Sequence, residues 1–274
     1  MFAWIVSMAA AAWLAFGLAD RTQAAESKGF VDLELVLAVD VSHSMDREEQ
    51  LLQRHGYAAA LRHRDVINAI RSGPNGRIAI SYLEWGERDY QSIVVPWTII
   101  SSARQAHEFA DALLTRSISQ AKRTSISNAL RFASAMIREN KIKSLRKVID
   151  VSGDGPNNSG LPVSVARDAT VRQGIVINGL AFVIERPADM SSFFAIADID
   201  RYYHNCVIGG PGSFMMRVTD KTEFETAIRR KLLQEIAGIQ LPPPARLHKA
   251  QFKTRATGYD CLVGERRWDA FQNE

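Results

Sequence analysis

The chain has 274 residues, of which 46% are hydrophobic and 23% are charged, proportions that are typical of a globular protein. This length suits one large domain with extensions or two small domains, and the core it can form needs no metal or disulfide to be stable. The formal net charge of +4 is spread along the chain and is only weak evidence for nucleic-acid binding, so we expect no nucleic-acid partner.

Residues 1–25 have the features of a signal peptide. Phe2–Leu18 is almost wholly apolar and uncharged, and small residues at Ala24 and Ala25 offer a cleavage site. No Lys or Arg precedes the apolar run, which leaves an uncleaved membrane anchor as the competing interpretation, but the run is short for a span. We therefore predict an exported protein, periplasmic or secreted, with no stable membrane span after cleavage.

Segments with strand and helix patterns alternate through residues 30–238, which we expect to form one domain. The expected strands are Val31–Val39, Arg77–Glu84, Ser92–Trp97, Leu145–Val151, Ile175–Ile184 and Phe214–Val218. The expected helices are Asp46–Ile70, a helix capped by Ser101 or Ser102 that ends near Leu114, Ile126–Ile137, Val163–Gln173, Ala188–Ala197 and Lys221–Ile236.

This alternation predicts an α/β fold with a doubly wound, mostly parallel six-stranded sheet and helices on both faces. The connection Gly86–Asp89 is so short that it indicates an antiparallel hairpin, and Pro96 in its second strand favours an edge position. We therefore expect one antiparallel edge strand.

Residues 239–274 are expected to form a proline-containing linker and a C-terminal tail. The run Leu241–Pro244 is typical of a semi-rigid linker, and residues 245–274 are either partly disordered or packed against the domain. Cys206 and Cys261 fit no zinc spacing. In an exported chain they form one disulfide or remain free, because nothing in the sequence fixes the distance between them.

Oxygen-bearing side chains follow three of the predicted elements. Asp40, Ser42 and Ser44 come at the end of the first strand, Thr124 precedes a helix, and Asp154 ends a strand in a Ser-Gly-Asp-Gly turn. The carboxyl ends of strands meet at one crevice of a doubly wound sheet, and oxygen donors suit a hard cation such as Mg²⁺. Thr124 alone is most simply a capping residue and Asp154 alone a turn residue, and Asp40, Ser42 and Ser44 are also common turn and capping residues, whereas the combination favours a metal site.

The pattern D-x-S-x-S at Asp40–Ser44, followed by Thr124 and Asp154, resembles the metal-ion-dependent adhesion site of the von Willebrand factor A domain family. The element order from Val31 to Ile236 also resembles that of the family. More narrowly, the chain resembles a group of exported bacterial proteins that have this domain and no assigned activity. One departure is Gln120–Arg123, because the loop before the threonine is usually rich in glycine in the family.

The resemblance implies a role for each of the five residues. Ser42 and Ser44 would bind the ion directly, and Thr124 would bind it directly or through water. Asp40 and Asp154 would hold coordinated waters. One coordination position would remain open for an Asp or Glu side chain of a partner protein.

We therefore predict a non-enzymatic binding protein that engages an acidic group of a protein partner through Mg²⁺, with Mn²⁺ or Ca²⁺ as substitutes. No H-E-x-x-H, G-x-S-x-G or P-loop pattern is present in the sequence. Two alternatives stay open: a metal-dependent phosphoester hydrolase with Asp40 as its nucleophile or base, and a structural domain without metal.

Two further segments have two interpretations each. Residues 116–147 contain nine Lys or Arg and one Glu, which is typical of either a basic binding face or a solvated helix flank. Asn157, Asn158 and Ser159 follow Asp154 closely, so they either shape specificity or cap the next helix.

Overall fold

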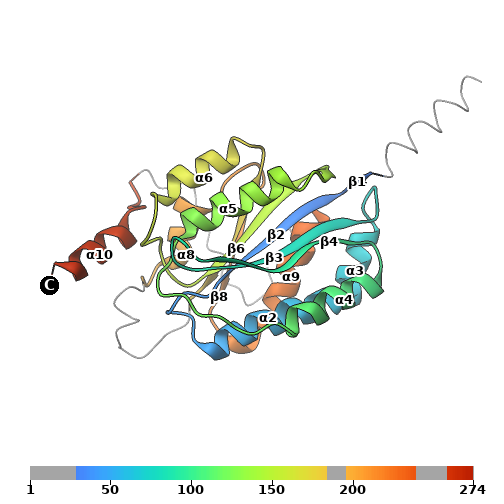
Figure 1. The fold of residues 1–274 in the computed structure, drawn as a ribbon, viewed down its shortest axis with the longest axis horizontal. Helices are drawn as coiled ribbons and strands as arrows, with labels where there is room; N and C mark the ends of the chain where they lie inside the picture. The colour runs from blue at the N-terminus through green and yellow to red at the C-terminus, as the bar shows by residue number, and fades with distance from the viewer. Residues whose placement is uncertain (1–28, 184–195, 239–257, 274) are drawn as a thin grey trace, which may run out of the picture.

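The structure, a computed structural model, describes residues 29–183, 196–238 and 258–273. It shows one sheet between two layers of helices (Figure 1). The predicted signal peptide at 1–25 and most of the predicted linker lie outside the described residues. So does most of the predicted helix Ala188–Ala197.

The main sheet has six strands in the order β4-β3-β2-β6-β7-β8. Their bounds are β2 Leu33–Asp40, β3 Ile78–Trp85, β4 Gln91–Ile100, β6 Lys147–Gly153, β7 Val176–Phe182 and β8 Met215–Val218. Every neighbouring pair is parallel except β3 and β4, which are antiparallel and place β4 at the edge. The predicted sheet and its antiparallel edge strand are therefore confirmed.

The sequence of the central strand β2 is apolar almost throughout because both of its faces are buried. All eight of its residues are buried. Leu35 and Leu37 face one hydrophobic core, and Val36 and Ala38 face the other, because successive side chains of a strand point to opposite faces. Both faces of the strand are covered by helices, as is usual for a parallel sheet.

Each helical layer closes one of these two cores. The first layer contains α2 Arg47–Arg62, α3 Arg64–Arg71, α4 Ala103–Leu114 and α9 Phe224–Ala237, which follows the short 3₁₀ helix η2 Lys221–Glu223. The second layer contains α5 Ile126–Glu139, α6 Val163–Val171, α8 Ile199–Tyr202 and the π-helical turn η1 Tyr203–Val207. The last helix, α10 Val263–Gln272, lies beside the carboxyl ends of the strands (Figure 1). No helix within the described ranges is both long and apolar enough to cross a membrane.

Two features differ from the sequence-based prediction. The single helix expected over Asp46–Ile70 is two helices, because His63 has an extended backbone (φ −70°, ψ 133°) that ends α2 and begins α3. Its Nδ1 accepts a hydrogen bond of 3.2 Å from the backbone N–H of Asp65, which stabilises the break. A small second sheet pairs β1 Phe30–Val31 with β5 Lys143–Ser144, and strands of two residues carry no pattern that could predict them.

Candidate metal-binding site

The end of β2 forms a tight turn that gathers its oxygen atoms. Asp40 is the last residue of the strand, and its Oδ1 accepts a hydrogen bond of 2.7 Å from the backbone N–H of Ser42. This bond bends the chain as an Asx turn does. It leaves the hydroxyl oxygens of Ser42 and Ser44 3.1 Å apart. Asp40 and Ser42 are almost completely buried, Ser44 is half-buried and His43 is exposed, so the turn leads from the core to the surface.

The neighbouring strand β6 brings the later aspartate to the same place. The hydroxyl of Ser44 donates a hydrogen bond of 2.7 Å to Asp154 Oδ1. A Cβ atom added to Gly155 would lie 3.6 Å from the hydroxyl oxygen of Thr124, so this side chain also borders the loop of Asp154. The structure thus brings Asp40, Ser42, Ser44 and Asp154 together at the carboxyl edge of the sheet, and Thr124 lies next to the loop that carries Asp154.

The position of Thr124 depends on two asparagines of the β6–α6 loop. Asn158 Oδ1 accepts a hydrogen bond of 3.0 Å from Thr124 N–H, and Asn158 N–H donates one of 2.9 Å to the Thr124 carbonyl. Asn157 Oδ1 accepts one of 3.0 Å from Ser127 N–H. It thereby replaces the side-chain cap that Ser125, the N-cap residue of α5, does not form.

These bonds correct the interpretation of Asn157, Asn158 and Ser159 as a cap of the next helix. The N-cap of α6 is Pro162, which makes no side-chain cap, and the asparagines instead hold the start of the preceding helix α5. Ser159 also contributes there, because its carbonyl accepts a hydrogen bond of 2.7 Å from the Ser125 hydroxyl.

The loop before Thr124 is held closely although it lacks the family's glycines. The backbone N–H of Ala121 donates a hydrogen bond of 2.8 Å to the Val41 carbonyl, and Ser125 N–H donates one of 2.7 Å to the Gly86 carbonyl. A Cβ atom at Gly86 would lie only 2.1 Å from the Ala121 Cβ. The glycine that allows close approach is therefore on the facing turn.

A tyrosine that the sequence did not point to lies behind the site. A Cβ atom on Gly153 would lie 2.6 Å from Tyr203 Oη and 2.7 Å from Asp40 Oδ2, so both groups surround this glycine. Burial raises the pKa of the Tyr203 phenol, and the charges of Asp40 and Asp154 raise it further. The phenol therefore stays neutral. Tyr203 belongs to the π-helical turn η1, whose short segment shows no helical periodicity.

Residues 30–240 match the sequence profile of the family described as Protein of unknown function (DUF1194). The chain belongs to this family. No curated protein matches the chain.

Solved structures with this fold are distant in sequence. The pilus adhesin SpaC of Lactobacillus rhamnosus GG, in its open conformation, has a TM-score of 0.56 and 14% identity over 75% of this chain and 30% of SpaC. Proximal thread matrix protein 1 of the mussel byssus has a TM-score of 0.54 and 12% identity over 77% of this chain and 47% of that protein. A von Willebrand factor type A protein of Catenulispora acidiphila has a TM-score of 0.49 and 11% identity over 75% of this chain and 43% of that protein.

This member of the DUF1194 family therefore spans less than half the length of each of these three proteins. Its fold is that of a von Willebrand factor A-like domain, as the order of elements in the sequence predicted. The two neighbours with a TM-score above 0.5 are a pilus adhesin and a thread matrix protein.

The donor set of the candidate site is dominated by hydroxyl groups. Among residues 29–183, 196–238 and 258–273, no group of three or more His, Cys, Asp or Glu side chains is arranged to hold a metal ion. The side-chain oxygens near the ends of β2 and β6 include the hydroxyls of Ser42, Ser44 and Thr124 and the carboxylates of Asp40 and Asp154.

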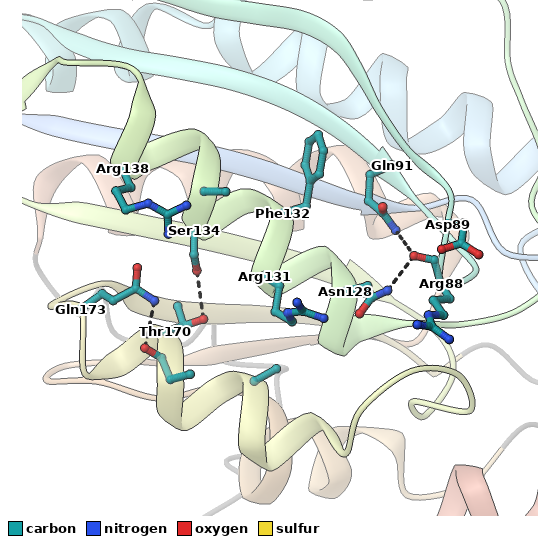
Figure 2. Close-up of a pocket in the computed structure, with 13 residues that line it drawn as sticks. Arg88, Asp89, Gln91, Asn128, Arg131, Phe132, Ser134, Arg138, Thr170 and Gln173 are labelled. Atoms are coloured by element: carbon teal, nitrogen blue, oxygen red, sulfur yellow. Dashed lines mark hydrogen bonds between the residues drawn. The ribbon is translucent and has the colours of Figure 1, made fainter.

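Part of the basic segment predicted from the sequence lines a groove between α5 and α6. The groove has a volume of about 540 Å³, and its lining residues include Arg88, Arg131 and Arg138. Figure 2 shows these arginines spaced along it, from the β3–β4 turn toward the far end of α5. At its floor, the hydroxyls of Ser134 and Thr170 are 3.0 Å apart.

Proposed function

We propose that the protein binds a divalent cation, Mg²⁺ in the first instance, and through it an acidic group of a protein partner. Asp40, Ser42, Ser44, Thr124 and Asp154 would hold the ion, and Mn²⁺ or Ca²⁺ could replace it. The observation that carries this proposal is the hydrogen-bonded series Ser42–Ser44–Asp154, which joins the turns after β2 and β6.

The spacing of these oxygens fits a hard cation. Mg²⁺ binds oxygen ligands octahedrally at about 2.1 Å, so neighbouring ligands lie about 3 Å apart. The separations of 3.1 Å between the serine hydroxyls and 2.7 Å between Ser44 and Asp154 are close to this value. The same atoms that bond to one another in this structure could therefore turn toward one ion with small rotations of their side chains.

The chemistry of the donors favours an acidic partner. Neutral hydroxyls leave most of the charge of the ion unbalanced, and a carboxylate entering an open position gains a charge-assisted bond. Basic groups near the carboxyl edge would add long-range attraction. They include Lys122, which is exposed beside Thr124, and Arg88 at the end of the groove between α5 and α6.

We assign no catalytic residue. Asp40 is the only carboxylate that the sequence offered as a nucleophile, but it is completely buried and its Oδ1 is bonded to Ser42 N–H. It is therefore poorly placed to attack an external ester. If the hydrolase alternative were correct, the protein would release phosphate from a generic phosphomonoester with Mg²⁺, and Asp40→Ala would abolish the release.

We also propose that the protein is exported, to the periplasm or outside the cell. The Cys206–Cys261 disulfide supports this location, because such bonds persist mainly in oxidising compartments. The apolar, uncharged residues Phe2–Leu18 agree with it.

A metal-dependent capture experiment tests the proposed function. Immobilised wild-type protein would be exposed to an envelope extract in Mg²⁺, eluted with EDTA, and the eluate identified by mass spectrometry. We expect a partner that is retained in Mg²⁺, released by EDTA and retained again on adding Mg²⁺. Asp154→Ala is the matched control and should retain none of it. Equal retention by both proteins, or retention that EDTA leaves unchanged, would contradict the proposal.

A further inference from the structure

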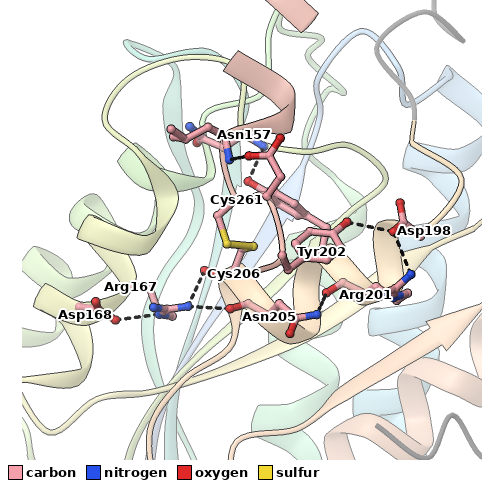
Figure 3. Close-up of a disulfide and its surroundings, with 12 residues drawn as sticks. Asn157, Arg167, Asp168, Asp198, Arg201, Tyr202, Asn205, Cys206 and Cys261 are labelled. Carbon is pink, nitrogen blue, oxygen red and sulfur yellow. Dashed lines mark hydrogen bonds and ion pairs between the residues drawn. A yellow bond between two sulfur atoms is a disulfide. The ribbon is translucent and has the colours of Figure 1, made fainter. Parts of the chain in front are cut away.

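The C-terminal helix α10 is attached to the domain by a covalent bond beside the candidate site. Cys206, in η1, forms a disulfide with Cys261, two residues before α10, and the bond joins segments 55 residues apart (Figure 3). Gly264 is the only buried residue of α10, so the helix has little apolar surface of its own in the core. A ten-residue helix with so little burial depends on such attachments for its position.

One set of contacts links α10 to the start of α5. Asn157 Nδ2 donates a hydrogen bond of 2.7 Å to Glu265 Oε1, while Asn157 Oδ1 accepts the bond from Ser127 N–H described above. The two backbones also approach closely, because a Cβ atom on Gly264 would lie 2.1 Å from the Asn157 carbonyl oxygen. The amide of Asn157 is thus held from both sides, by α10 and by α5.

A second set links α10 to Thr124 itself. The guanidinium carbon of Arg123 lies 3.8 Å from the ring centroid of Trp268, in a cation–π contact. Arg123 Nη2 also donates a hydrogen bond to the Asn158 carbonyl. Asn158 in turn holds the backbone of Thr124 through both its side chain and its own N–H.

The two sets of contacts lead from α10 to the same short segment, residues 124–127, at the edge of the candidate site. We propose that α10 is a brace for this segment and that Glu265 and Trp268 are positioning residues for the Thr124 hydroxyl. This inference rests on the proposed metal site. It assigns the tail a role in metal affinity, with the Cys206–Cys261 bond keeping the brace in place.

The charge of Arg123 explains why an aromatic residue suits position 268, which faces its guanidinium group. Arg123 is partly buried, its Nε makes no hydrogen bond within the described part of the chain, and burial lowers its pKa. The face of an indole ring is the strongest aromatic site for a guanidinium. Phe at position 268 would keep most of that contact, whereas Ala would remove it and leave Arg123 free to move away from Asn158.

Two pairs of variants test the brace. Trp268→Ala and Glu265→Ala remove the contacts, whereas Trp268→Phe keeps a ring and Glu265→Gln keeps an acceptor oxygen for Asn157. Isothermal titration calorimetry with MgCl₂ would measure metal affinity. We expect each Ala variant to weaken it about tenfold, as loss of groups that support metal ligands typically does, and each conservative variant to remain within about threefold of wild type.

Hydrogen exchange of the metal-free proteins gives a readout that does not depend on the ion. The amides of Thr124 and Ser127 should exchange about tenfold faster in Trp268→Ala than in wild type, while those of β2 stay unchanged. Reducing wild type with dithiothreitol should have the same effect. The reagent passes two electrons and two protons to the Cys206–Cys261 bond, giving two thiols, and is itself oxidised to a cyclic disulfide.

The outcomes separate this inference from the proposed function. If wild type binds no Mg²⁺, the proposed function fails and the inference fails with it. If wild type binds Mg²⁺ and the two Ala variants bind it equally well, only the inference is overturned. Unchanged exchange at Thr124 and Ser127 in Trp268→Ala would also overturn it, and exchange that rises across β2 as well would show general destabilisation instead of a brace.

Discussion

Ser44 donates a hydrogen bond to Asp154 across 110 residues of sequence, and this bond joins the turns that follow two neighbouring parallel strands. The relationship matters because β2 and β6 meet only in the folded sheet. It sets the spacing of the Ser44 hydroxyl and the Asp154 carboxylate in the absence of a ligand, which would lower the cost of organising the proposed metal site.

Replacement of the Ser44 hydroxyl should lower both the stability of the fold and the metal affinity of the proposed site. In Ser44→Ala the hydrogen bond to Asp154 is lost, and we expect the free energy of unfolding without metal to fall by about 1 kcal/mol. The increase in melting temperature that Mg²⁺ produces in wild type should also disappear. His43→Ala is the matched control, because His43 is exposed between the two serines and should leave both quantities unchanged. A full response to Mg²⁺ in Ser44→Ala would remove this hydroxyl from the site.

The two glycines on either side of Asp154, Gly153 at the end of β6 and Gly155 in the loop that follows, should differ in their tolerance of a methyl group. Gly153→Ala would push a Cβ into Asp40 Oδ2 and Tyr203 Oη at 2.7 and 2.6 Å, so a group behind the site must shift. We expect a loss of about 1–3 kcal/mol in the free energy of unfolding and at least a tenfold loss of Mg²⁺ affinity. Gly155→Ala meets only Thr124, at an ordinary 3.6 Å, and should be close to wild type in both.

Urea denaturation and metal titration of these two variants provide the measurements. Equal behaviour of Gly153→Ala and Gly155→Ala would show that the packing around Asp40 does not control the site.

A buried ionic cluster between β6 and α9, formed by Asp150, Lys231 and Glu235, should be important for stability. Lys231 Nζ lies 2.5 Å from Asp150 Oδ1 and is also paired with Glu235, and all three residues are almost completely buried. Lys231→Met would leave two carboxylates without their cation, and we expect the free energy of unfolding at pH 7 to fall by about 3–5 kcal/mol. Arg104→Ala, which breaks an exposed pair with Glu108, should cost no more than about 0.5 kcal/mol. Similar losses in the two variants would contradict the assignment.

The same cluster should make stability depend on pH. Burial raises the pKa of Glu235 from its ordinary 4.5 to about 7, the charge of Asp150 adds to the rise, and Lys231 opposes it. The folded state therefore holds a proton that the unfolded chain has already lost. The stability that this proton supplies is fully present below about pH 4.5 and is lost as the pH rises through about 7.

Glu235→Gln isolates this contribution because it cannot titrate. The free energy of unfolding of wild type minus that of Glu235→Gln should decrease between pH 5 and pH 8 in urea denaturation. A difference that is constant, or that increases over this range, would show that Glu235 does not hold the proton.

Much of the fold could be predicted because its signals are local. The apolar run of β2, the stripe of α5 and the short turn before β4 each follow from neighbouring residues. The break at His63 could not be predicted, because the apolar residues on either side of it keep helical spacing and both α2 and α3 pack against α9.

The candidate site also has one part that could be predicted from the sequence and one part that could not. Asp40, Ser42 and Ser44 are close in sequence, and the order of the strands in the sheet brings Asp154 to them. The groups that support Thr124 lie far away along the chain: Asn158 is 34 residues from it, and Glu265 is 108 residues from Asn157. The sequence left the pairing of Cys206 with Cys261 open for the same reason, because only the tertiary structure fixes that distance.

We propose that one divalent ion binds among the side chains of Asp40, Ser42, Ser44, Thr124 and Asp154. Calorimetric titration of MgCl₂ into the metal-free wild type and Asp154→Ala proteins tests it most directly. We expect one ion per wild-type chain and no measurable binding to Asp154→Ala. Absence of binding to wild type, or the same affinity in both proteins, would contradict it.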